Sequence, residues 1–150
     1  GVQTFAPAMI DQATPSLIVN SGSKQGITNP PGNSPYNVAK AALKSYTELL
    51  QHELRNTVDC NVTAHLLIPG MTTTGTREHS PGAWLPDQVI DMLVDSLNRG
   101  DFYILCPDGE VTREMDRKRI LWTAGDITDN RPPLSRWHDN YRDKFEKFSP

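Results

Sequence analysis

Short apolar runs alternate with longer segments of helical periodicity along this chain of 150 residues. Three runs have the length and composition of strands and lie at residues 16–21, 61–68 and 102–106. Four segments repeat apolar residues at helical spacing and lie at residues 2–12, 36–54, 86–98 and 110–124. Strands that alternate with helices form parallel sheets covered by helices. The pattern therefore predicts an α/β fold with three layers, and a loop at residues 22–35.

Composition narrows the class of protein further. Apolar residues make up 37% of the chain and the net charge is −3, which argues against a disordered chain and against a nucleic-acid binder. No run approaches a membrane span, and no secretory signal precedes the first apolar segment. Cys60 and Cys106 form no CxxC motif and the four histidines show no ligand spacing, so we expect reduced thiols, no metal site and a cytoplasmic location.

Three polar residues around the second helical segment indicate proton transfer. Ser23 lies thirteen positions before Tyr36, and Lys40 follows Tyr36 by four, so Tyr36 and Lys40 share one face of a helix. A free tyrosine has a pKa of about 10, and a nearby ammonium lowers that value by favouring the phenolate. We therefore expect Tyr36 to act as an acid or base near neutral pH. Ser23 follows a strand, at the edge where open parallel sheets bind ligands, so its hydroxyl is placed to orient a substrate carbonyl.

In this region the chain resembles the second half of the short-chain dehydrogenase/reductase family. The stretches that carry the resemblance are Leu17-Ile18-Val19-Asn20-Ser21-Gly22-Ser23, Tyr36-Asn37-Val38-Ala39-Lys40 and Pro69-Gly70. The resemblance implies the C-terminal part of a Rossmann-like, doubly wound parallel sheet at residues 1–125, with the N-terminal cofactor half absent. Residues 126–150 would then form a tail that covers the active site or contacts a second subunit, and the sequence does not decide between these roles.

The resemblance also implies a function and roles for individual residues. The family transfers hydride between NAD or NADP and a carbonyl/alcohol pair, and the sequence does not tell the two cofactors apart. By resemblance, Tyr36 is the acid/base, Lys40 lowers its pKa and holds the nicotinamide ribose, and Ser23 positions the substrate. The implied cofactor-binding residues are Tyr36, Lys40, Pro69, Gly70, Thr72 and Thr74. A small-molecule substrate and a homodimer or homotetramer paired through residues 2–12 and 36–54 are expected, without nucleic acid or membrane partners.

Several features leave alternatives open. The glycines supply no turn for a cofactor diphosphate, so we expect the 150 residues alone to be inactive and to belong to an enzyme of about 250 to 300 residues. The alternative is a non-catalytic, dehydrogenase-like module for binding or assembly. Hydrolysis by Ser23 is disfavoured because Ser21 and Gln25 stand where a nucleophile elbow needs glycine. The mixed charges from Arg113 to Arg119 read as a solvated helix face, and Trp84 as either a substrate contact or a partly buried anchor.

Overall fold

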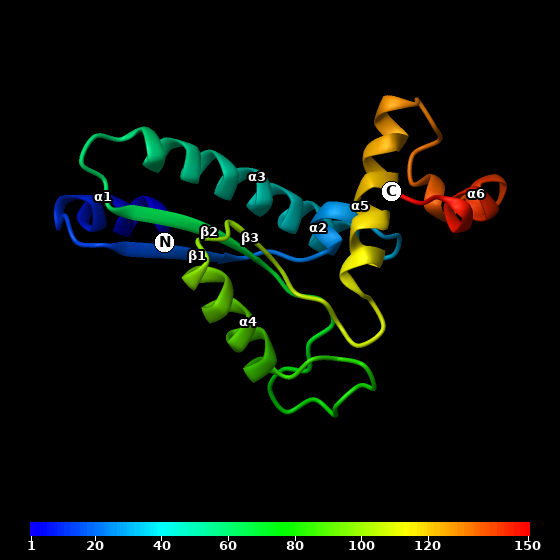
Figure 1. Ribbon diagram of the computed structural model, residues 1–150, viewed down its shortest axis with the longest axis horizontal. Helices are drawn as coiled ribbons and strands as arrows, with labels where there is room; N and C mark the ends of the chain where they lie inside the picture. Colours follow the sequence, from blue (N-terminus) through cyan, green and yellow to red (C-terminus); the bar gives the residue numbers. More distant parts are fainter.

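The computed structural model describes residues 1–150, and in it three parallel strands lie between helices (Figure 1). The elements are α1 (Val2–Asp11), β1 (Ser16–Ser21), α2 (Gln25–Thr28), α3 (Ser34–Asn56), β2 (Val62–Ile68), α4 (Pro86–Asn98), β3 (Tyr103–Leu105), α5 (Arg113–Thr128), the 3₁₀ turns η1 (Ser135–Trp137) and η2 (Asp139–Tyr141), and α6 (Arg142–Lys147). The α/β fold with a parallel sheet is confirmed.

The sheet has the order β1-β2-β3, and its central strand is buried on both faces. On one face, Leu50 and Leu54 of α3 pack against Val62 and Ala64, and α1 adds apolar side chains to the same cluster. On the other face, Val89 of α4 packs against a second cluster that includes β2 and β3 residues. Burying a leucine or valine side chain contributes about 1.5 to 3 kcal/mol, so the two clusters hold α3 and α4 to opposite faces. This is the three-layer arrangement that the sequence predicts.

Strand β1 forms an edge of the sheet and pairs only with β2. Its residues are half-buried or exposed, and Leu17 is 50% exposed although the strand is apolar on both faces. Phe5 of α1 and Val38 and Leu49 of α3 are also largely exposed. An open edge beside exposed apolar side chains is a surface that proteins normally cover.

The structure differs from several of the sequence-based boundaries. Residues 22–35 are not all loop, because the short helix α2 lies within them. Helix α5 begins at Arg113 rather than at residue 110, since the Thr112 side chain caps it by accepting a hydrogen bond from the backbone N–H of Met115 at 3.3 Å. The same helix continues to Thr128 and so runs past the expected boundary at residue 125. Strand β3 is also shorter than residues 102–106.

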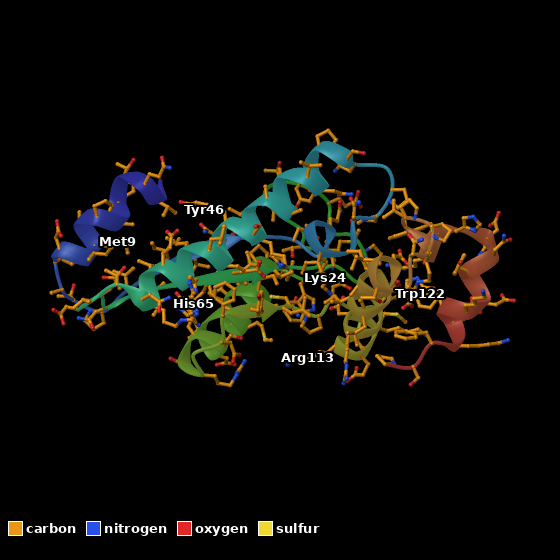
Figure 2. The ribbon with its side chains drawn as sticks, turned by 90° about the horizontal axis from the view of Figure 1, so that it is seen from above. Met9, Lys24, Tyr46, His65, Arg113 and Trp122 are labelled. Carbon is orange, nitrogen blue, oxygen red and sulfur yellow. The ribbon has the colours of Figure 1, made fainter.

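The segment after α5 packs on that helix, not on the sheet. We call residues 129–150 the η1–α6 segment. The Trp122 side chain of α5 is 3% exposed, and its indole N–H donates to the Ser135 hydroxyl at 2.8 Å. The rings of Phe145 and Phe148 stand edge-on to the Trp122 ring at 5.4 Å. Figure 2 shows Trp122 between α5 and the end of the chain, so this residue anchors the segment.

None of the helices combines the length and apolar composition that a membrane crossing requires. No three His, Cys, Asp or Glu side chains gather closely enough to hold a metal ion, and Cys60 and Cys106 are both free thiols.

Candidate functional site

The residues predicted to carry chemistry meet at the carboxyl edge of the sheet. Because the strands are parallel, the segments that follow β1, β2 and β3 leave the sheet on the same side. Ser23 follows β1, Pro69 and Gly70 follow β2, and Asp108 follows β3. Tyr36 is the third residue of α3, which begins near this edge.

A glycine allows the serine segment to approach the tyrosine helix. Helix α2 lies against α3, and a Cβ atom at Gly26 would come within 2.5 Å of the carbonyl carbon of Lys40 and 2.7 Å of its oxygen. Real Cβ atoms essentially never lie this close to backbone. A side chain at this position would therefore separate Ser23 from Tyr36 and Lys40, which lie on the other helix.

Lys40 connects the strand end to the tyrosine. Its ammonium donates to the backbone carbonyl of Ser21 at 2.7 Å and lies 5.6 Å from the centroid of the Tyr36 ring. The hydroxyl of Ser23 accepts a hydrogen bond from the backbone N–H of Gln25 at 3.2 Å. A hydroxyl that accepts a bond from its own chain keeps its proton available for another acceptor. The Lys40 and Ser23 side chains are thus oriented by backbone contacts.

All of the predicted site residues line one cavity. This α4-side cavity has a volume of ≈ 420 Å³ and is closed on one side by Pro86, Val89 and Ile90 of α4. Its other lining residues are Ser21, Gly22, Ser23, Tyr36, Lys40, Leu67, Pro69, Gly70, Thr72 and Thr74. The sequence-based set of Ser23, Tyr36, Lys40, Pro69, Gly70, Thr72 and Thr74 is therefore brought together in space.

A second cavity shares a wall with the first. This α5-side cavity also measures ≈ 420 Å³, and Ser23, Tyr36, Pro69 and Gly70 line both cavities. The remaining lining residues are Lys24, Gln25, Thr28, Pro30, Met71, Asp108, Arg119, Arg136 and Trp137. Small-molecule sites are usually clefts of this order of volume. The edge of the sheet therefore offers two neighbouring spaces with Ser23 and Tyr36 between them.

A cluster of ion pairs forms part of the wall of the α5-side cavity. The Lys24 ammonium lies 2.6 Å from Asp116 and 3.5 Å from Asp108, and Asp108 also accepts a hydrogen bond from the backbone N–H of Met71 at 3.1 Å. Figure 2 shows Lys24 beside α5. Burial raises the pKa of Asp116, although the Lys24 charge opposes this shift. Asp108 thus links the segments that follow all three strands.

This cluster corrects one interpretation of the sequence. The charged run from Arg113 to Arg119 is not uniformly a solvated face, because Asp116 is 4% exposed and paired to Lys24. Arg119 is half-buried and lines the α5-side cavity. A helix with charge on every side shows no apolar stripe, so the pattern gave no sign of which face turns inward.

Trp84 and His65 are structural residues. Trp84 packs against the Leu67 cluster, and its backbone N–H donates to the Met71 carbonyl at 2.8 Å. Trp84 does not line either cavity at the sheet edge, which supports the anchor interpretation. His65 is 8% exposed, with one ring nitrogen 2.9 Å from the Asp101 carbonyl, as expected for a packed histidine.

Arg136 and Trp137 line the α5-side cavity, and they belong to the tail that the sequence places over the active site or at a subunit contact without naming either as a site residue. They belong to η1, more than one hundred positions after Ser23, and no spacing rule joins the two segments. The only signal is the adjacency of an arginine and a tryptophan after Pro132-Pro133, which is compatible with many surface loops. Their position depends on the docking of the η1–α6 segment on Trp122.

Comparisons with known proteins agree with this architecture. The model of the family described as short chain dehydrogenase matches residues 1–82. A short chain dehydrogenase/reductase from Burkholderia phymatum, solved in complex with NAD, has a TM-score of 0.75 and 25% identity over 89% of this chain and 55% of its own. The bulky-bulky ketone specific alcohol dehydrogenase from Comamonas testosteroni has a TM-score of 0.63 and 18% identity over 93% and 52%.

The match covers only part of the solved proteins. The chain spans about half the length of these solved structures, 55% of one and 52% of the other. No curated protein matches the sequence significantly.

Proposed function

Because the chain belongs to the short-chain dehydrogenase family, we propose that it forms the catalytic part of an NAD(P)-dependent oxidoreductase that interconverts a carbonyl and an alcohol. One observation carries the proposal: Ser23 and Tyr36 line two adjoining cavities at once. A reaction between a cofactor and a substrate needs two neighbouring spaces with the proton donor between them. The α4-side cavity is assigned to the nicotinamide end of the cofactor and the α5-side cavity to the substrate.

The donors of the α4-side cavity fit the nicotinamide end of NAD(P). Lys40 has three N–H groups and uses one on the Ser21 carbonyl, which leaves two for the hydroxyls of a ribose. Thr72 donates to the Gly70 carbonyl at 3.3 Å, so its oxygen is held in place and can accept from an amide. Tyr36, Pro69, Gly70 and Thr74 complete the assigned contacts. These residues serve one end of the cofactor, and the diphosphate has no glycine-rich turn among them.

The chain's own residues move the proton. Ser23 donates a hydrogen bond to the substrate oxygen and holds it beside Tyr36. When a carbonyl is reduced, the Tyr36 hydroxyl gives its proton to that oxygen as the carbon receives a hydride, and the carbonyl becomes an alcohol. When bound, NAD(P) supplies or accepts the hydride. The Lys40 ammonium beside the Tyr36 ring stabilises the phenolate that the transfer leaves behind.

The test replaces Tyr36 by phenylalanine in the full-length enzyme. Tyr36→Phe removes the transferred proton and keeps the ring, so turnover should fall by about 10² to 10⁴-fold while NADH binding, followed by its fluorescence, persists. Tyr46→Phe is the matched control, because Tyr46 lies on the same helix and both tyrosines are 39% exposed. Wild-type turnover by Tyr36→Phe would refute the assignment. Cofactor binding without any turnover in the wild-type protein would favour the binding or assembly module.

A further inference from the structure

Two arginines in the α5-side cavity have no carboxylate partner. Arg119 comes from α5 and Arg136 from η1, and neither forms one of the ion pairs of the structure. The Nε atom of Arg119 is buried and donates no hydrogen bond. A buried donor without an acceptor is costly, so such groups are normally satisfied. Arg119, which lines the cavity, therefore has neither an ion pair nor a hydrogen bond at Nε within the chain.

The neighbouring carboxylates do not neutralise the two arginines. Asp116 feels the Arg119 charge, but it is already 2.6 Å from Lys24, and Asp108 is 3.5 Å from the same ammonium. Three cations, Lys24, Arg119 and Arg136, therefore stand against two carboxylates in and around this cavity. One positive charge remains uncompensated.

Arg136 is held in place by aromatic rings instead of by an acid. Its guanidinium carbon lies 4.6 Å from the centroid of the Trp137 ring and 5.3 Å from that of Phe145. Such cation–π contacts fix the orientation of a guanidinium and leave its N–H groups free for an anion. Burial, with a contribution from the Arg119 charge, lowers the pKa of Arg136 to about 10, so the side chain is still cationic at neutral pH. The positive charges of Arg119 and Arg136 therefore repel each other.

We infer that Arg119 and Arg136 bind a carboxylate on the substrate, whose carbonyl or alcohol then lies at Ser23 and Tyr36. The inference rests on the proposed function, because the same cavity is assigned to the substrate there. Arginine is suited to this role, since its planar fork matches the two oxygens of a carboxylate. The indole of Trp137 lines the same cavity and offers an apolar surface to the carbon skeleton between the two polar ends. The substrate class is therefore keto acids and the corresponding hydroxy acids.

The test compares acids with their uncharged amides in the full-length enzyme. Pyruvate, levulinate and 4-acetylbenzoate place a carboxylate at increasing distances from a ketone, and the amide of each keeps the ketone. Binding is measured by calorimetry and turnover by NAD(P)H absorbance. At least one acid should bind and react about tenfold to a hundredfold better than its amide, and Arg119→Gln or Arg136→Gln should remove that preference while amide turnover persists.

Matched variants separate this effect from a general loss of structure. Arg117→Gln removes an arginine from the same helix that faces a different surface hollow, and it should leave the acid preference unchanged. Arg136→Lys keeps the charge and should retain part of the preference. Equal binding of acid and amide for all three probes, or no binding of any acid, would overturn the inference. Selective acid binding without turnover would support it and would instead contradict the proposed reaction.

Discussion

The close contact between α2 and α3 predicts the effect of one added methyl group. In Gly26→Ala the new Cβ would lie 2.5 Å from the Lys40 carbonyl carbon and 2.8 Å from the Ala41 nitrogen. Ordinary contact begins at 3.4 Å, so the Cβ must move by about 0.9 Å. Both atoms belong to helix backbone and cannot rotate away, so α2 has to shift as a unit.

This shift should affect both stability and turnover. Overpacking of this kind costs about 1 to 3 kcal/mol in the free energy of unfolding. Ser23 lies just before α2 and Tyr36 is on α3, so their separation changes with the shift, and a misplacement of about 1 Å in a catalytic group can reduce turnover by about 10²-fold. The assays are urea unfolding and steady-state kinetics of the full-length enzyme.

Two further variants test whether the Cβ atom at position 26 causes the effect. Gly26→Ser should behave like Gly26→Ala, because the clash is at the Cβ atom and not beyond it. Gln25→Ala, at the neighbouring position of α2, adds no atom near α3 and should change the unfolding free energy by less than about 0.5 kcal/mol. If Gly26→Ala kept the wild-type stability and turnover, the two helices would not approach each other in this way.

Two other predictions concern groups with shifted pKa values. Burial raises the pKa of the fully buried Cys106 thiol to about 11, so iodoacetamide at pH 8 should label Cys60 and spare Cys106 in peptide mapping; rapid labelling of both before unfolding would contradict this. The Tyr103 hydroxyl donates to Glu48 at 2.5 Å, and Tyr103→Phe should lower the unfolding free energy by about 1 kcal/mol at pH 7. Partial burial raises the pKa of Glu48, but hydrogen bonds from Lys44 and Tyr103 outweigh this and hold it below its ordinary value of 4.5. The stability that the Tyr103–Glu48 hydrogen bond contributes is therefore present above the unfolded pKa near 4.5, and it is lost as the pH falls through the folded pKa. Denaturation curves of both proteins should therefore converge in acid, and a difference independent of pH would refute this origin.

The fold was predictable because its signals are local. Val62, Ala64, Leu66 and Ile68 alternate along one face of residues 62–68, and the leucines of α3 repeat at helical spacing, so each segment specifies its own structure before any packing. Helix α4 begins and ends where its Pro86 and the following Gly100 indicate. The errors fall where such signals are weak: α2 has only four residues, too few for a period, and the start of α5 depends on the side chain of Thr112.

The lining of the α4-side cavity was predictable from the sequence, and most of the lining of the α5-side cavity was not. Ser23, Tyr36 and Lys40 lie within eighteen residues of each other, and strand, loop and helix rules place them at one edge. The α5-side cavity depends instead on contacts between distant segments, such as the pair of Lys24 and Asp108, which are 84 positions apart. No periodicity encodes such a pairing, because it depends on how α5 and the segment before it pack against α2.

The docking of the η1–α6 segment on Trp122 separates two tasks along the chain. The residues assigned to proton transfer end at position 40, whereas Arg136 and Trp137 belong to a segment that is hydrogen-bonded to α5. Sequence changes in residues 129–150 can thus reshape the α5-side cavity without disturbing the strand ends or α3. Variation in ligand preference can accumulate in this region while the reaction chemistry stays the same, which makes it the natural region to randomise in a directed-evolution library.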